Sequence, residues 1–272
     1  ELIMLSDIAG YVGADTCGCL LAIRQDQQEE ISLMIDIGTN GEMVLGNRER
    51  MVTCSTAAGP AFEGAKIECG MRGAAGAVDH VKYEDGKWNY TTVGNKPAVG
   101  LCGSGLIDLV AGLLDAGMLD ENGVLRSGQE KQGVFILVPP ERGGNERGVY
   151  LTQKDLGEVQ LAKAAIAAGI QMLMERLGIT EDDICSVYIA GAFGNYMDPV
   201  SAGKIGLLPA TLVKKVKPVG NAAGEGAKIA LVNEKEMLEM DELVRKIEFV
   251  ELAASADFQD HFIDELGFET GE

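Results

Sequence analysis

The chain has 272 residues, of which 46% are hydrophobic and 24% charged, so it is long enough to bury a substantial core. Its formal net charge of -19 argues against nucleic acid as a partner, because an acidic surface repels phosphates. No apolar run approaches the length of a membrane helix, and the first residues lack the basic flank of a signal peptide, so we expect no membrane contact and a cytoplasmic protein.

The first informative element is an apolar segment over residues 31–35, which predicts a buried strand that holds Asp36 at its end. A carboxylate in this place suits a hydrated Mg²⁺ ion, which prefers oxygen ligands. The residues that follow would turn the main chain tightly and line a concave anion site with N–H groups and one hydroxyl. These residues are Gly38, Thr39, Asn40 and Gly41. An ordinary hairpin is the alternative, since Asn-Gly is a strong turn signal by itself.

A third strand is expected at residues 51–54, followed by a turn and a helix that begins at Pro60. Glu63 and Lys66 lie three residues apart on that helix, so they would share one face and reach a ribose or adenine edge. A surface ion pair of little energetic value is the alternative. The glycine-rich residues 70–76 interrupt this pattern, and a hairpin that turns at Asp85–Gly86 then begins an expected insertion.

Two helices are predicted next. Residues 104–114 have helical periodicity, and the Gly103, Ser104 and Gly105 sequence at the start could offer N–H groups to phosphate or to a partner. The alternative is that these small residues only permit a tight entry into the helix. Thr152 and Asp155 predict the capped start of a long helix that ends at Gly178.

A later apolar strand at residues 187–190 runs into a glycine-bounded turn, and a helix is expected near Asp198. Glycines in this turn would let a flat base lie against the main chain. The turn consists of Gly191, Ala192, Phe193 and Gly194. Near the C-terminus, residues 237–250 and 257–266 have the spacing of solvated faces of amphipathic helices.

Several other chemistries are disfavoured. The six cysteines include no C-x-x-C pair, so we expect no iron–sulfur cluster or zinc site in this chain. There is no P-loop sequence, and no G-x-G-x-x-G follows a strand, which disfavours P-loop and dinucleotide-binding folds.

The D-x-G-T-x-G hairpin at Asp36 and the later strand that ends in a glycine turn resemble the phosphate and adenosine motifs of the actin, sugar-kinase and heat-shock-chaperone ATPase superfamily. More specifically, the chain resembles the C-terminal domain of the reductive activators of corrinoid proteins. The segments that carry this resemblance are residues 8–15, 36–42, 54–65, 100–105, 189–194 and 219–226.

The resemblance implies an α/β fold with a ribonuclease-H-like mixed sheet flanked by helices, as in an actin-like ATPase subdomain, and a smaller inserted α+β subdomain. The core would comprise about residues 1–70 and 151–272, and the insertion about 71–150. Members of this family use ATP to return inactive Co(II) corrinoid to Co(I), so ATP and Mg²⁺ are the expected cofactors. A corrinoid protein is the expected partner, and a homodimer is a further expectation.

The resemblance also assigns roles to the residues already singled out. Asp36 would organise Mg²⁺ as the catalytic and metal-binding residue, residues 38–41 would bind phosphate, and residues 191–194 would back the adenosine. Glu63 with Lys66, and residues 103–105, would supply further nucleotide or partner contacts.

Full-length members of the family carry an N-terminal iron–sulfur domain and a first ATPase subdomain with its own D-x-G-T hairpin. This chain shows one such hairpin and begins at Glu1, so we expect a fragment that turns over ATP poorly by itself. A 2Fe–2S cluster is expected only in the N-terminal domain. Two alternatives stay open: another ATPase of the superfamily, such as a sugar kinase or an acyl-CoA dehydratase activator, and a corrinoid-protein docking module with a vestigial nucleotide cleft.

Overall fold

The computed structural model describes residues 5–126 and 133–268, and its contacts divide the chain into two compact units. Unit 1 comprises Glu1–Thr56, Ala168–Asn195 and Lys214–His261. Unit 2 comprises Ala57–Ala167, Tyr196–Val213 and Phe262–Glu272. The expected division into a core and an insertion at residues 71–150 stays a prediction.

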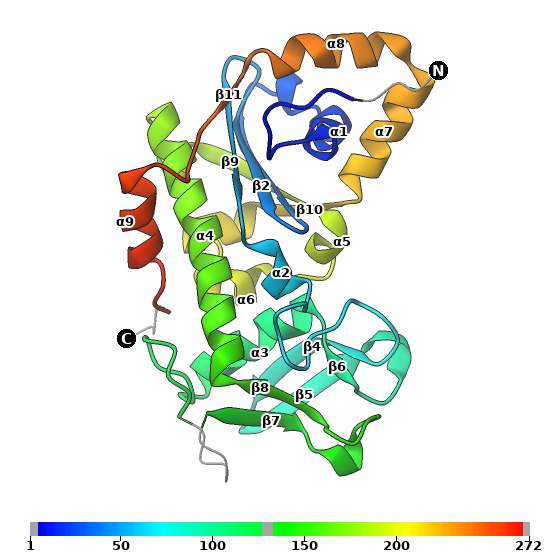
Figure 1. The fold of residues 1–272 in the computed structure, drawn as a ribbon, viewed down its shortest axis with the longest axis vertical. Coiled ribbons are helices and arrows are strands. Elements are labelled where there is room, and N and C mark those ends of the chain that lie inside the picture. Colours follow the sequence, from blue (N-terminus) through cyan, green and yellow to red (C-terminus); the bar gives the residue numbers. More distant parts are fainter. Residues whose placement is uncertain (1–4, 127–132, 269–272) are drawn as a thin grey trace. The chain divides into compact units, whose positions relative to one another are not determined.

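Unit 1 is built on a six-stranded sheet in the order β10-β9-β1-β2-β3-β11 (Figure 1). β2 runs antiparallel to β1 and β3, whereas β9, β10 and β11 run parallel to their neighbours. This mixed arrangement is ribonuclease-H-like, which confirms the predicted fold class. The strands are β1 (Ile31–Ile37), β2 (Gly41–Gly46), β3 (Met51–Thr56), β9 (Ile184–Ala190), β10 (Val216–Gly220) and β11 (Ile247–Phe249).

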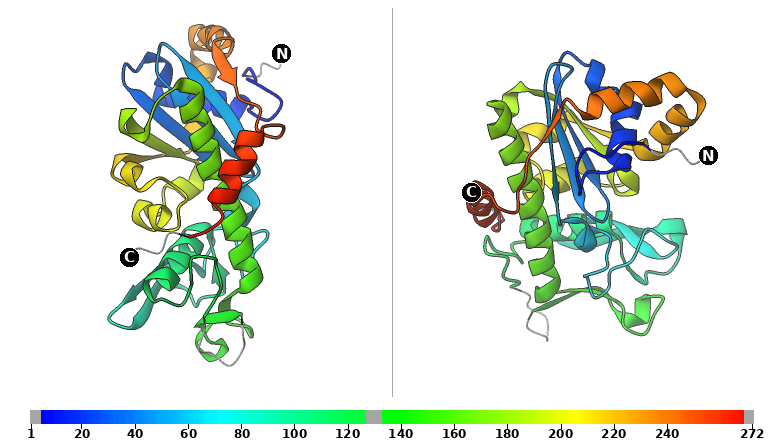
Figure 2. Two further views of the ribbon diagram at one scale, coloured as in Figure 1. Left: turned by 90° about the vertical axis from the view of Figure 1, so that its left-hand side faces the viewer. Right: turned by 45° about the horizontal axis from the view of Figure 1, so that its top comes forward.

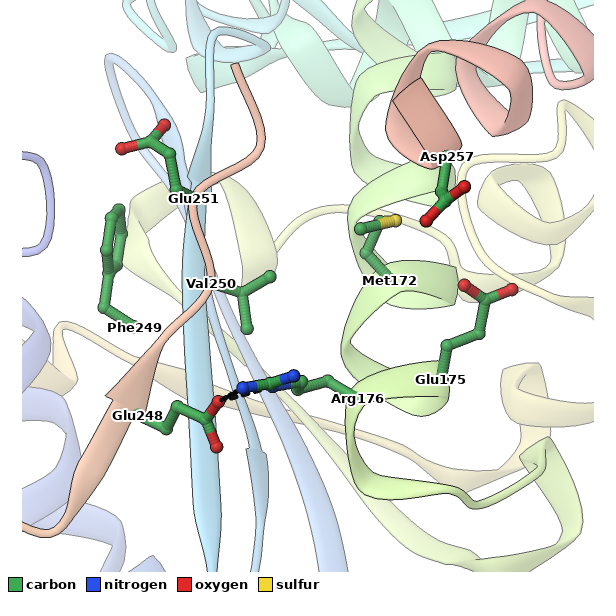
Figure 3. Close-up of a pocket in the computed structure, with 8 residues that line it drawn as sticks. All are labelled: Met172, Glu175, Arg176, Glu248, Phe249, Val250, Glu251 and Asp257. Atoms are coloured by element: carbon green, nitrogen blue, oxygen red, sulfur yellow. Dashed lines mark hydrogen bonds and ion pairs between the residues drawn. The ribbon is translucent and has the colours of Figure 1, made fainter. Parts of the chain in front are cut away.

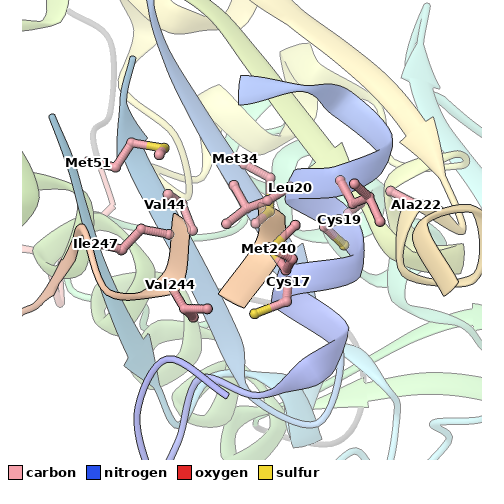
Figure 4. Close-up of a cluster of buried hydrophobic side chains, with 12 residues drawn as sticks. Cys17, Cys19, Leu20, Met34, Val44, Met51, Ala222, Met240, Val244 and Ile247 are labelled. Carbon is pink, nitrogen blue, oxygen red and sulfur yellow. The ribbon is translucent and has the colours of Figure 1, made fainter. Parts of the chain in front are cut away.

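Helices cover both faces of this sheet, as Figures 1 and 2 show. One face carries α1 (Ala14–Ile23), α7 (Ala222–Val232) and α8 (Glu234–Val244). Cysteine and leucine side chains of α1 pack there with methionine side chains of β1, β3 and α8 into a buried apolar cluster (Figure 4). The C-terminal part of α4 (Gln153–Leu177) lies on the other face, where the Cys54 thiol contacts the Gly169 carbonyl at 4.0 Å.

Unit 2 contains a three-stranded sheet, a two-stranded sheet and several helices. The Asp85–Gly86 turn between the first two strands has positive φ at both residues, as predicted for a two-residue hairpin. Thr152 and Asp155 form a capping box at the start of α4: the Thr152 hydroxyl oxygen accepts from the Asp155 amide at 3.2 Å, and Asp155 Oδ2 accepts from the Thr152 amide at 2.9 Å. The elements are α2 (Gly59–Phe62), β4 (Ala77–Glu84), β5 (Lys87–Thr92), β6 (Gly100–Leu101), α3 (Gly103–Asp115), β7 (Val134–Val138), β8 (Val149–Thr152) and α6 (Pro199–Lys204).

One expectation near the C-terminus was wrong. Residues 237–250 do not form one amphipathic helix: α8 ends at Val244, and the chain then adds β11 to the free edge of β3. The second segment does form a helix, α9 (Ala256–Asp264). Within residues 5–126 and 133–268, we find no helix whose length and apolar character suit a membrane crossing.

Candidate functional site

The structure brings the Asp36 hairpin and the 191–194 turn together in unit 1. Asp36 is the sixth residue of β1, where it faces Glu42 across the hairpin and Ala190 across the parallel pair with β9. Gly191 follows with φ +86°, and a Cβ atom at this position would lie 2.9 Å from Asp36 Oδ1. A side chain is therefore excluded at Gly191 both by its backbone conformation and by the carboxylate beside it.

Burial raises the pKa values of two carboxylates at this site. Burial raises the pKa of Asp36, while a hydrogen bond from the Cys19 thiol at 3.6 Å lowers it and the nearby Asp15 charge raises it. Burial also raises the pKa of Glu42 to about 6, and the side chain is only 8% exposed. In the part of the chain that the structure describes, neither Asp36 nor Glu42 has an ion-pair partner. Two facing carboxylates without a counterion repel each other, so a divalent cation would stabilise the ionised pair.

The turn after β1 leaves open space in front of the main chain. The Gly38 amide donates to the Asn40 carbonyl at 2.9 Å, and a Cβ atom on Gly38 would meet no atom within 4 Å. Neither Gly38 nor Gly41 has positive φ, so a left-handed turn does not explain these glycines. The structure instead shows that the absent side chain keeps the approach to the Gly38 main chain clear, as a phosphate group would require.

The predicted glycine turn is a single helical turn, α5 (Gly191–Gly194). A Cβ atom on Gly194 would lie 2.5 Å from Ile189 Cγ2, so this glycine lets the turn pack directly on the end of β9. The main chain of Ala192 and the partly buried Phe193 lie between the two glycines. The arrangement gives the end of β9 a flat backbone surface beside Asp36.

The other predicted contacts belong to unit 2, and the structure changes the interpretation of Glu63 and Lys66. They do not share a helix face, because α2 ends at Phe62 and Gly64 has φ +78°. Lys66 forms its ion pair with Glu158 of α4 at 3.1 Å, and its side chain is 55% exposed. The left-handed Gly64 ends the helix before Glu63 and Lys66 can lie on one face. A nucleotide contact from either residue stays a prediction.

Packing accounts for much of the sequence at the start of α3. The Ser104 hydroxyl donates to the Asp79 carbonyl at 2.8 Å, and Ser104 is 2% exposed. A Cβ atom on Gly105 would lie 2.2 Å from the Val78 carbonyl oxygen, so glycine allows α3 to contact β4 directly. The Gly103 main chain is also buried. A phosphate or partner contact at Gly103, Ser104 or Gly105 stays a prediction.

Sequence reasoning missed three side chains of the Asp36 site: Asp15, Cys19 and Glu42. Glu42 was recognisable in principle, because a hairpin that turns over residues 38–40 places it opposite Asp36 on the same face. Asp15 and Cys19 come from α1, which no local pattern connects to the hairpin.

Unit 1 also contains a pocket of about 340 Å³ between α4, β11 and the start of α9 (Figure 3). Four carboxylates and one guanidinium dominate its lining, but most of these charges are already used. Glu248 pairs with Arg50 and Arg176, and Glu175 pairs with His261 at 2.9 Å. Within the described ranges, no group of three or more His, Cys, Asp or Glu side chains is arranged to hold a metal ion. We assign no function to this pocket.

The mixed sheet, with a carboxylate at the end of β1 and a glycine-bounded turn at the end of β9, defines an actin-like ATPase domain. The family model for the C-terminal domain of RACo, described as the ASKHA domain, matches residues 30–272. The chain belongs to this family.

Two curated proteins and one solved structure are similar over nearly the whole chain. The corrinoid activation enzyme RamQ of Eubacterium limosum is 38% identical over 94% of this chain and 45% of its own length. The Co(II) methylated amine-specific corrinoid protein reductase of Methanosarcina barkeri is 30% identical over 99% of this chain and 52% of its own length. The structure of a reductive activator for corrinoid, iron–sulfur protein matches with a TM-score of 0.90 and 40% identity, over 97% of this chain and 44% of that one. The chain thus spans about half the length of these relatives.

Proposed function

We propose that this chain is the nucleotide-binding C-terminal half of an ATP-dependent reductive activator, which returns the Co(II) form of a corrinoid protein to Co(I). The names of the relatives support the activity, since each names a corrinoid protein or its activation. The family match supports the nucleotide, because the domain is of the ASKHA class. The observation that carries the proposal for this chain is that Asp36 and Gly191 lie side by side at the C-terminal ends of β1 and β9.

In this proposal ATP binds with Mg²⁺ at the Asp36 site. Asp36 would hold the hydrated metal ion, residues 38–41 would face the phosphates, and residues 191–194 would lie beside the adenosine. Bound Mg²⁺ would neutralise phosphate charge, which is the main requirement of phosphoryl chemistry. The raised pKa of Asp36 and the open face of Gly38 fit this assignment, since the first is relieved by a cation and the second leaves room for an anion.

The rest of the activity would depend on other parts of the protein. Electrons would come from a 2Fe–2S cluster in an N-terminal domain, and nucleotide binding or hydrolysis would be coupled to contact with the corrinoid protein. Contacts from Glu63, Lys66 and residues 103–105, a cytoplasmic location and a homodimer are also part of the proposal.

Isothermal titration calorimetry with ATP and ADP in the presence of Mg²⁺ tests the nucleotide site. We expect Asp36→Ala to weaken binding about 100-fold, because loss of a charged ligand costs about 3 kcal/mol. Asp257→Ala is a matched control, since it removes an exposed carboxylate of the same unit at the pocket of Figure 3. Equal affinities for Asp36→Ala and the unmodified chain, or no binding by either, would count against the site.

A further inference from the structure

We propose that the Asn195 side chain reads the base of the bound nucleotide and selects adenine over guanine. This inference rests on the proposed function, because it concerns the same nucleotide site. It adds a residue and a specificity that the motif at residues 191–194 does not contain.

Asn195 lies, like Asp36, near the C-terminal ends of the parallel strands of the unit 1 sheet. It is the residue directly after α5, and α5 follows β9, whose last residue Ala190 pairs with both Asp36 and Gly220. A Cβ atom on Gly220 would lie 3.2 Å from Asn195 Nδ2, so the amide group lies against the end of β10. The proposed metal ligand Asp36 and the Asn195 amide therefore lie near the C-terminal ends of three neighbouring strands, β1, β9 and β10.

The amide of Asn195 is available to a ligand. Its side chain is exposed, and it makes no hydrogen bond to any residue in the described ranges. The neighbouring amide at this edge, Asn221, is already used, because its Oδ1 accepts a hydrogen bond from the Gly224 amide at 3.0 Å and caps α7. Of these two asparagines, Asn195 is thus the one that can pair with a base.

An asparagine amide offers one acceptor and two donors, which match adenine. Adenine presents its N6 amino donor beside the N7 acceptor, and asparagine pairs with both atoms at once. Guanine presents two acceptors, O6 and N7, at the same edge, so one of the two hydrogen bonds is lost. An aspartate at this position would only accept hydrogen bonds, so it would keep the bond from the adenine N6 amino group and lose the bond to N7. It would offer no donor to O6 or N7 of guanine.

Calorimetric titration with Mg²⁺ tests the inference with three probes: ATP, GTP and inorganic tripolyphosphate. We expect the unmodified chain to bind ATP at least about 10-fold more tightly than GTP, and Asn195→Ala to lower this ratio about 10-fold. The affinity for tripolyphosphate should stay the same, because it has no base. Asn195→Asp should weaken the binding of both ATP and GTP, because a carboxylate has no donor for N7. Asn89→Asp adds the same charge at an exposed position of β5 and should leave the ratio unchanged.

The possible results separate this inference from the proposed function. No binding of any probe by the unmodified chain would overturn both. Binding of ATP with an ATP to GTP ratio that is near one, or that Asn195→Ala leaves unchanged, would overturn the role of Asn195 and leave the nucleotide site supported.

Discussion

Two glycine-containing turns, one in each unit, look alike in sequence but have different surroundings. At the end of β1, a Cβ atom on Gly38 would meet nothing within 4 Å, and the adjacent carboxylates of Asp36 and Glu42 have raised pKa values. At the start of α3, a Cβ atom on Gly105 would lie 2.2 Å from the Val78 carbonyl oxygen, and the Ser104 hydroxyl donates a hydrogen bond to the Asp79 carbonyl. The first turn has open space and carboxylates with raised pKa values, whereas the second is tightly packed against β4. Glycine by itself therefore does not mark a binding site.

The largest effect on stability is expected at the packed turn. Gly105→Ala forces a methyl group into the Val78 carbonyl, so α3 must move away from β4. We expect a loss of about 3 kcal/mol in the free energy of unfolding, at the upper end of the usual cost of overpacking. Urea denaturation followed by circular dichroism measures it. Gly157→Ala is the matched control, because a Cβ atom there meets no atom within 4 Å and Gly157 does not have positive φ. Gly117→Ala is unsuitable because Gly117 has positive φ. An unchanged midpoint for Gly105→Ala would contradict the close contact.

The next effect is a gain of stability at the open turn. Glu42 has a pKa of about 6 in the folded chain and 4.5 as an ordinary glutamate, so the folded state holds this proton more tightly. Below pH 4.5 the group contributes nothing, and as the pH rises through 6 the folded state loses up to about 2 kcal/mol.

Glu42→Gln removes that loss, so without Mg²⁺ or nucleotide we expect it to stabilise the chain by up to about 2 kcal/mol at pH 8 and to have little effect near pH 4. Thermal unfolding of both proteins across this pH range provides the measurement. The prediction fails if the two stability profiles run parallel.

Ser104→Ala should have a smaller effect. It removes the 2.8 Å hydrogen bond to the partly buried Asp79 carbonyl, and we expect a loss of about 1 kcal/mol, the usual net value of such a bond. Urea denaturation measures this loss. Ser104→Thr keeps the hydroxyl but adds a methyl group, so it distinguishes the loss of the hydrogen bond from a change in packing. A neutral Ser104→Ala would show that the hydroxyl does not stabilise the start of α3.

The smallest effect on stability is expected for Gly38→Ala, within about 0.5 kcal/mol of zero, because the new methyl group meets open space. Its effect on ligand binding should be large in comparison. A methyl group in front of the phosphate turn should weaken Mg²⁺·ATP binding, measured by calorimetry, while the unfolding midpoint hardly moves. A variant that binds nucleotide normally would mean that the open space at Gly38 has no role in binding.

Local patterns were enough to predict several elements. The capped start of α4 at Thr152 and Asp155, its end at Gly178 and the two-residue turn at Asp85–Gly86 all depend on residues within a few positions of one another. Such interactions depend mainly on residues close in the sequence. The strand of Asp36 was predicted for the same reason, since its apolar residues alone indicate burial.

Long-range contacts decided the rest. Residues 247–249 became a strand because β3 offered a free edge, although the acidic and apolar spacing around them favours a helix. Glu63 and Lys66 were separated by a left-handed Gly64, whose Cβ position is filled by the Gly70 and Met71 backbone. Cys19 and Asp15 reached Asp36 only because α1 packs on the sheet face.

By itself, the sequence determined the hairpin that carries Asp36 and the glycine turn at residues 191–194, because each depends on residues adjacent in the chain. The fold class followed from the family resemblance of several segments together. Only the tertiary structure decided that Gly191 lies beside the Asp36 carboxylate, that Glu42 is buried opposite it and that Asn195 makes no side-chain hydrogen bond within residues 5–126 and 133–268. The physical reason is that burial and pairing depend on which segments the sheet brings side by side, and local patterns in a single sequence do not reveal the partners of a strand.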